Sequence, residues 1–159
     1  AAEGTLGKQH LFELLELVDQ SEFIYVLETN GMTIGHDPKF AKELSRFNNL
    51  HVRVSIKGAC EEEYVRLTGA MSASYELPYK ALEYLIKEKV SCNACLSISF
   101  SSSENIKKAE KRLSDIRPGI LKSLEKEHIT LFPKVYKRLK HLDMMPNSHR
   151  FAGKIINRK

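Results

Sequence analysis

Two segments of the chain alternate apolar with polar side chains in a way that could line a binding site. In 50–57 the apolar residues share one face of an extended strand, and the other face carries His51, Arg53, Ser55 and Lys57. In 91–100 the second polar face is made of Ser91, Asn93, Cys95, Ser97 and Ser99. Burying an unpaired hydroxyl or amide costs about 1–3 kcal/mol. The two polar faces therefore predict a wet cavity that holds a ligand.

The cysteines are the next candidates for chemistry. Cys92 and Cys95 form a Cys-x-x-Cys pair, but in an extended strand positions three apart point to opposite faces. A structural zinc site would also need two more ligands, for which Cys60 and a histidine are the only suggestion. We therefore expect ordinary buried thiols, no disulfide framework and no metal site.

Acid–base and nucleotide motifs are weak in this chain. His36 and His51 have no carboxylate partner at a recognisable spacing, so each is expected to be packed or solvated. The acidic run 61–63 fits the first turn of a helix, where the macrodipole favours negative charge. The glycines near residue 31 do not form a phosphate-binding loop pattern.

The elements that position these residues alternate along the chain. Strands are predicted near 23–28, 50–56, 93–100 and 129–132. Helices are predicted over 8–19, 38–46, 61–69 and 78–89. A further helix is predicted to begin at 103, a short one to end at 124 and the last to begin at 133. Strands joined through helices indicate parallel pairing with right-handed crossovers. The fold class expected is α/β, a partial (βα) TIM-like barrel, because polar alternation suits a barrel interior.

In such folds ligands bind at the carboxyl ends of the strands. Here that rim is expected to comprise 28–31, 55–58, 97–101 and 132–133.

Composition sets the class of protein. The 159 residues are 42% hydrophobic and 28% charged, which is typical of one soluble domain with its own core. We expect a barrel domain over 1–143 and a basic C-terminal tail over 144–159. Three cysteines, no secretory leader and no bilayer-spanning apolar run favour the cytoplasm and no membrane.

The net charge of +5 is unevenly distributed. From residue 134 onward the chain holds eight basic residues against one acid, so the rest carries a net charge of −2. A nucleic-acid partner would depend on the tail alone and is not favoured, because a solvated helix face followed by a frayed end explains the same charges.

The order of these segments resembles the radical S-adenosylmethionine (radical SAM) enzymes, especially the group akin to glycyl-radical-enzyme activases and archaeal iron–sulfur oxidoreductases. The resemblance runs from the N-terminus to about Leu142. It is carried by 28–31 (Glu-Thr-Asn-Gly), 54–58 (Val-Ser-Ile-Lys-Gly), the serine-rich end of the third strand and 129–133. The start, 1–7, resembles a degraded Gly-Gly-Glu-Pro motif in which only Glu3 matches.

This resemblance implies S-adenosylmethionine as cofactor and a set of residues near it. Glu3 would lie beside the methionine amino group and Asn30 near the cofactor. Ser55 and Lys57 match positions beside the ribose. Ser97 and Ser99 would help to shape the pocket.

The chain departs from the family pattern in two places. Ala1 and Ala2 stand where the motif has two glycines, and a Cβ there disfavours close backbone approach. The family's Cys-x-x-x-Cys-x-x-Cys motif, which binds the [4Fe-4S] cluster, is absent from the sequence. This chain alone is therefore not expected to perform the family reaction.

Two explanations of the missing motif remain open. One is that the chain is the C-terminal part of a radical SAM enzyme whose cluster loop lies outside it, and the other is that it is a degenerate, non-catalytic homologue or interaction module. A third function, the nucleic-acid-binding part of an RNA-modifying enzyme, depends on the tail. The substrate, a small molecule or a protein, is not specified by the sequence. Open sheet edges predict a homo-oligomer.

Overall fold

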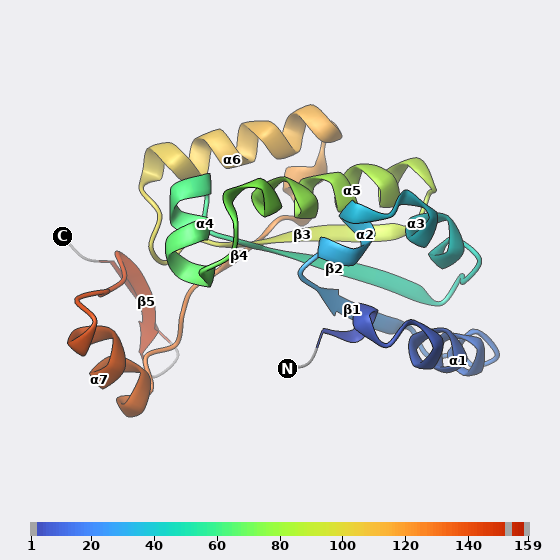
Figure 1. Ribbon diagram of the computed structural model, residues 1–159, viewed down its shortest axis with the longest axis horizontal. Helices are drawn as coiled ribbons and strands as arrows, with labels where there is room; N and C mark the ends of the chain where they lie inside the picture. The colour runs from blue at the N-terminus through green and yellow to red at the C-terminus, as the bar shows by residue number, and fades with distance from the viewer. Residues whose placement is uncertain (1–2, 152–153, 158–159) are drawn as a thin grey trace.

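A computed structural model describes residues 3–151 and 154–157. Its main sheet has the strand order β1-β2-β3-β4, and every neighbouring pair is parallel. The four strands are β1 (Tyr25–Thr29), β2 (Leu50–Lys57), β3 (Ser91–Ser97) and β4 (Glu125–Glu127). Together with the helices between them, these strands confirm the predicted α/β fold with a parallel sheet (Figure 1).

The helices begin and end near the predicted residues. They are α1 (Lys8–Asp19), α2 (Met32–His36), α3 (Pro38–Leu44), α4 (Glu61–Thr68), α5 (Leu77–Lys87), α6 (Ser103–Ile116) and α7 (Pro133–His141). Short 3-10 turns cover Gly4–Leu6, Ser72–Glu76 and Ile120–Ser123. Local chemistry explains the boundaries: Asp37 caps α3 by accepting from the Lys39 backbone N–H, and Ser102 caps α6 through Asn105.

The apolar halves of the alternating strands form the core. Val52, Val54 and Ile56 of β2 are fully buried, as the alternation predicts. Helices α2 to α6 lie over this face of the sheet, and α5 contributes Leu82 and Leu85 to the core (Figure 1). The polar side chains of the same strands therefore point away from these helices.

Helix α2 was not predicted, and glycine makes its packing possible. Gly31 precedes it with a φ of 75°, and a Cβ there would lie 2.9 Å from Val54 Cγ1. At Gly35 a Cβ would lie 2.1 Å from the backbone oxygen of Leu77. The absence of side chains at both positions lets α2 pack directly against the start of α5.

The fourth strand is not where the sequence predicted it. It covers Glu125–Glu127, whereas 129–132 forms no strand of the main sheet. Instead Thr130 makes an isolated parallel bridge to Arg150, and the Leu131 N–H donates to the Arg150 carbonyl. Apolar content alone suggested 129–132, but ion pairing stabilises the charged segment 125–127 beside β3.

The third strand also ends earlier than predicted, at Ser97 rather than Phe100. Beyond it the Ser99 hydroxyl accepts a hydrogen bond from the Ile129 N–H at 2.7 Å. This bond ties the segment just beyond β3 to the segment after β4.

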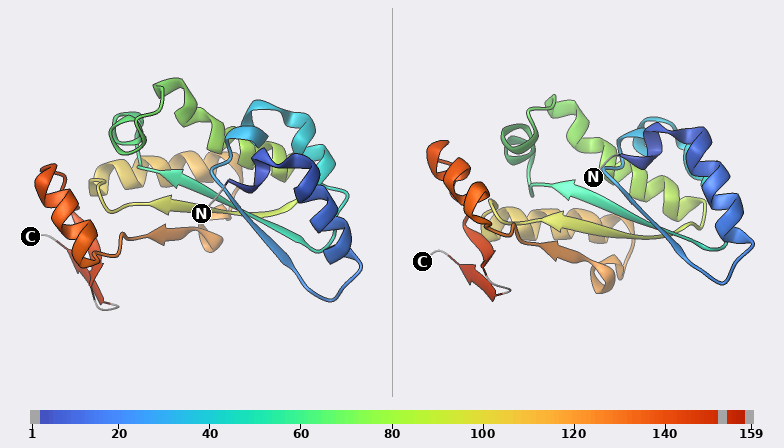
Figure 2. Two further views of the ribbon diagram at one scale, coloured as in Figure 1. Left: turned by 60° about the horizontal axis from the view of Figure 1, so that its bottom comes forward. Right: turned by 90° about the horizontal axis from the view of Figure 1, so that it is seen from below.

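The segment predicted as a tail forms a hairpin of β5 (Ser148–Phe151) and antiparallel β6 (Lys154–Asn157). The backbone N–H groups of Asn147 and Ser148 both donate to the Ser99 carbonyl. Figure 2 shows the hairpin and α7 beyond the carboxyl ends of the parallel strands. None of the helices in the described part of the chain combines the length and apolar character needed to cross a bilayer.

Candidate functional site on the polar face of the sheet

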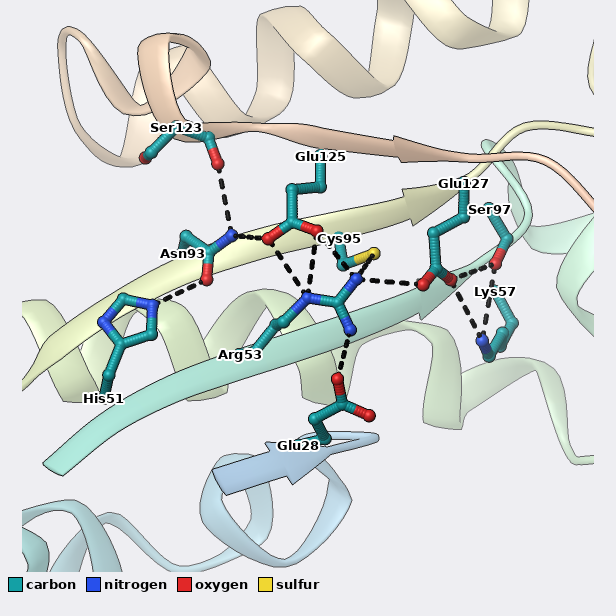
Figure 3. A network of polar contacts seen from close by, with 10 residues as sticks. All are labelled: Glu28, His51, Arg53, Lys57, Asn93, Cys95, Ser97, Ser123, Glu125 and Glu127. Carbon is teal, nitrogen blue, oxygen red and sulfur yellow. Dashed lines mark hydrogen bonds and ion pairs between the residues drawn. The ribbon is translucent and has the colours of Figure 1, made fainter. Parts of the chain in front are cut away.

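The polar face of the sheet is a set of side chains that point away from the covering helices. The strand register arranges them in rows across the sheet. In one row Arg53 of β2 is paired with Glu28 of β1 and Asn93 of β3. In another row Ser97 of β3 is paired with Lys57 of β2 and Glu127 of β4. Figure 3 shows the side chains from all four strands converging in front of the sheet. The polar face comprises Glu28, His51, Arg53, Ser55, Lys57, Asn93, Cys95, Ser97, Glu125 and Glu127.

Arg53 is the centre of this face. Its Nη1 lies 2.6 Å from Glu28 Oε1, and its Nη2 lies 2.7 Å from Glu125 Oε2 and 3.0 Å from Glu127 Oε1. Nη2 also donates to Cys95 Sγ at 3.1 Å. One guanidinium on β2 thus contacts β1, β3 and β4, which requires side chains to converge on the concave side of a curved sheet.

The charges in this network stabilise one another. Hydrogen bonding to Glu125 raises the pKa of Arg53 above its usual value, and the bonds from Arg53 and Asn93 lower the pKa of Glu125. Burial alone would raise the pKa of Glu127, but its bond with Cys95 and the nearby Lys57 and Arg53 lower it. Arg53, Glu125 and Glu127 are therefore all charged at neutral pH.

His51 belongs to the same network, although the sequence showed no partner for it. Its Nδ1 lies 2.8 Å from Ser91 Oγ and its Nε2 lies 2.9 Å from Asn93 Oδ1. The Asn93 amide donates in turn to Glu125 Oε1 at 2.8 Å. The Glu125 carboxylate is thus linked to the His51 imidazole through the Asn93 amide. Glu125 belongs to β4, which the sequence predicted at 129–132 instead.

The cysteines behave as their spacing predicts. Cys92 packs in the core on the helix side, whereas Cys95 contacts Arg53 on the polar face. Burial raises the pKa of Cys92 to about 11, and burial together with the bond to Glu127 raises that of Cys95 to about 12. Within residues 3–151 and 154–157, no group of three histidine, cysteine or acidic side chains could hold a metal ion.

Ser55 differs from its neighbours on the polar face. Its hydroxyl oxygen is buried and has no hydrogen-bond partner among the described residues. Lys57 is the next residue of β2 on the same face, two positions after Ser55. Its Nζ lies 3.4 Å from Ser97 Oγ and 3.6 Å from Glu127 Oε2. A buried hydroxyl without a partner is costly, although Ser55 itself is not among the residues that line the cavity described next.

A cavity of about 520 Å³ opens at the carboxyl ends of β2, β3 and β4. It holds three of the residues expected from the sequence, Lys57, Ser97 and Ser99. The rest of the lining comes from Arg53, Leu67, Thr68, Phe100, Glu125, Lys126, Glu127, His128, Ile129 and Arg150. Its size and mixed lining are within the usual range for small-molecule sites.

Glu3 and Asn30 meet at the end of β1, outside the lining of this cavity. Glu3 Oε2 accepts from the Asn30 N–H at 2.8 Å, and Oε1 accepts from the hydroxyls of Thr5 and Thr29. Burial would raise the pKa of Glu3, but these bonds lower it. The Asn30 side chain accepts from the Met32 N–H. Ala1 and Ala2 lie outside the described residues.

The functional candidates that sequence analysis missed are Glu125, Glu127, His128 and Arg150. The first two alternate around Lys126 with a period of two, which is a strand signal made of charges rather than apolar residues. The last two are brought to the cavity by the hairpin. No local pattern in the sequence indicated that contact.

Comparisons with known proteins identify the fold. No protein-family model matches the chain, and no curated protein matches it. The solved structure of native anSMEcpe with bound AdoMet and Cp18Cys peptide does match, with a TM-score of 0.53 and 24% identity. The chain shares the fold of anSMEcpe, a radical SAM enzyme. The match covers 88% of this chain and 42% of anSMEcpe.

Two further anSMEcpe structures agree. The form with bound AdoMet and Kp18Cys peptide gives a TM-score of 0.51 at 24% identity and covers 87% of this chain and 41% of that one. The form with AdoMet alone gives a TM-score of 0.51 at 20% identity, covering 87% and 42%. The chain therefore spans less than half the length of the proteins it matches.

Proposed function

We propose that this chain is the S-adenosylmethionine-contacting part of a radical SAM enzyme, with the cofactor bound at the carboxyl ends of β2 and β3. The observation that carries the proposal is the cavity lined by Lys57 and Ser97 at these strand ends, with the buried, unpartnered Ser55 hydroxyl between the lining residues Arg53 and Lys57 on the same strand face. The fold, shared with enzymes that bind AdoMet, supports the same placement.

We assign each of these residues a different role in binding. Ser55 would donate to or accept from a ribose hydroxyl, and Lys57 and Ser97 would stand beside it at the next row. Ser99 holds the wall of the cavity through Ile129. Glu3 and Asn30 shape the end of β1 through their mutual bond rather than through a free carboxylate. When bound, S-adenosylmethionine supplies a sulfonium whose reductive cleavage begins radical chemistry.

The iron–sulfur cluster is proposed to bind outside these residues. Cys92 and Cys95 lie on opposite sides of the sheet, and Cys60 precedes α4, so the three thiols do not converge. A [4Fe-4S] cluster needs several thiolates that converge on one point in space. The cluster and the oxidoreductase or activase type of reaction are proposals drawn from the sequence resemblance, and a cytoplasmic location is a proposal drawn from the composition.

Calorimetric titration of the 159-residue chain with S-adenosylmethionine tests the proposal. We expect saturable binding that Ser55→Ala weakens about tenfold, which corresponds to one lost hydrogen bond of about 1.4 kcal/mol. Because the hydroxyl has no partner in the free chain, the same variant is expected not to lower Tm.

The matched control is Ser45→Ala, which removes an exposed hydroxyl bonded to the Lys42 carbonyl. It should leave S-adenosylmethionine affinity unchanged. No binding by the unmodified chain, or equal affinity in Ser55→Ala, would overturn the proposal and favour a non-catalytic homologue.

A further inference from the structure

The cavity at the strand ends carries an excess of positive charge. On the polar side of the sheet its lining includes three basic side chains, Arg53, Lys57 and Arg150, against two carboxylates, those of Glu125 and Glu127, while Lys126 pairs with Glu110 on α6. An excess of one sign of charge concentrates ligands of the opposite sign. The ligand group that fits this wall is therefore an anion.

Existing ion pairs show which of these cations remains available. Arg53 takes up both carboxylates of the lining, and Lys126 Nζ lies 2.6 Å from Glu110 on α6. Lys57 Nζ approaches Glu127 only to 3.6 Å. Arg150 makes no salt bridge with any residue in the described part of the chain, so its charge faces the cavity uncompensated.

The pKa of His128 responds to the positive charge of Arg150. Its Nδ1 lies 2.9 Å from Ser148 Oγ, and it lines the cavity together with Arg150. Burial and the positive charge of Arg150 both lower the pKa of His128. The other charged groups that line the cavity are Arg53 and Lys57 of β2 and Glu125, Lys126 and Glu127 of β4.

The fold fixes the backbone of Arg150. Its N–H donates to the Ile129 carbonyl at 2.8 Å, and its carbonyl accepts from the Leu131 N–H at 3.0 Å. Asn147 and Ser148 hold the start of the same strand against the Ser99 carbonyl. The side chain is exposed, yet it projects from an anchored strand, which reduces the entropy lost on binding.

We propose that Arg150 and Lys57, with His128 beside them, form an oxyanion subsite that binds a carboxylate or phosphate group of the substrate. This inference rests on the proposed function for the identity of the ligand as a substrate. The subsite itself rests on the charge and anchoring of the cavity wall. Arginine suits this role because its guanidinium binds planar oxyanions through two parallel hydrogen bonds.

Proton NMR of the His128 ring, with inorganic phosphate as the probe, tests the subsite on the whole chain. We expect phosphate to shift the His128 resonances saturably and to raise its pKa, because the anion offsets the field of Arg150. Arg150→Gln should raise the His128 pKa without phosphate and weaken phosphate binding at least tenfold. Its backbone bonds are unaffected by the substitution, so the fold should persist.

Arg46→Gln is the matched control, since Arg46 is an exposed arginine that does not line this cavity. It should leave both measurements unchanged. Phosphate binding that is absent, or equal in Arg150→Gln and the unmodified chain, would overturn the subsite.

Calorimetry with S-adenosylmethionine separates the two sources of an oxyanion. If Arg150→Gln binds S-adenosylmethionine as well as the unmodified chain does, the subsite belongs to the substrate. If Arg150→Gln loses as much affinity for S-adenosylmethionine as it loses for phosphate, that assignment is overturned in favour of the cofactor's own carboxylate. Phosphate binding without any S-adenosylmethionine binding would refute the proposed function and leave the subsite standing.

Discussion

Two polar residues at the residue scale show why burial alone does not mark a ligand site. Glu3 and Ser55 were both expected near the cofactor. The carboxylate of Glu3 is bonded by Thr5, Thr29 and Asn30, whereas the hydroxyl of Ser55 is bonded by no described residue. The first is explained by bonds within the chain itself, and the second is available for the ligand that the proposed function places there.

Glu3→Gln is expected to destabilise the fold by about 2 kcal/mol at pH 7, because an amide nitrogen cannot accept the bonds that the carboxylate accepts. The pKa of Glu3 is lowered from 4.5 in the folded chain. Its contribution is therefore present above pH 4.5 and lost as the pH falls through the folded value. Urea unfolding at pH 7 and pH 3 measures this.

The exposed Glu22 supplies the control for that experiment. Glu22→Gln should unfold at the same urea concentration as the unmodified chain at both pH values. A Glu3→Gln variant that does the same at pH 7 would show that its carboxylate does not hold the end of β1.

At the scale of elements, ion pairing rather than apolar burial places β4. Glu125 and Glu127 face Arg53, and between them Lys126 faces Glu110 on the other side of the sheet. A strand with such a sequence has no hydrophobic alternation. It forms because its charges match those of its neighbours in register.

Arg53→Met is therefore expected to destabilise the chain by about 2 kcal/mol, because it leaves three partly exposed carboxylates without their common partner. Carboxylate repulsion disappears on protonation, so the deficit should shrink in acid. Urea unfolding at pH 7 and pH 4 measures both effects.

Lys111→Met, which removes an exposed pair with Asp115 on α6, is the matched control and should change stability by less than about 0.5 kcal/mol. Equal effects of the two substitutions would contradict a role for Arg53 in holding the sheet.

The same contrast explains how much could be predicted. Strands and helices with a clear apolar period, such as 50–57 and 8–19, were placed closely. Ser55, Lys57 and Ser97 were assigned to the polar face by alternation alone. Glu125 and Glu127 were missed because their pattern is one of charge. Arg150 was missed because long-range pairing of the hairpin, which no local pattern encodes, brings it to the cavity.

At the scale of the whole molecule, the chain forms a curved parallel sheet covered by helices on one face and lined by polar groups on the other. β1 and β4 are the outer strands of this sheet in the described residues. Such edges are pairing templates, so association into a homo-oligomer stays a prediction. In the proposed function, the cavity at the strand ends is the region in which the cofactor and the substrate meet.

Backbone amide NMR of the chain during titration with S-adenosylmethionine tests this account most directly. We predict saturable shifts concentrated at the carboxyl ends of β2 and β3, including Ser55, Lys57 and Ser97, with little change across α5 and α6. No saturable shifts, or shifts confined to the helix-covered side of the sheet, would contradict it.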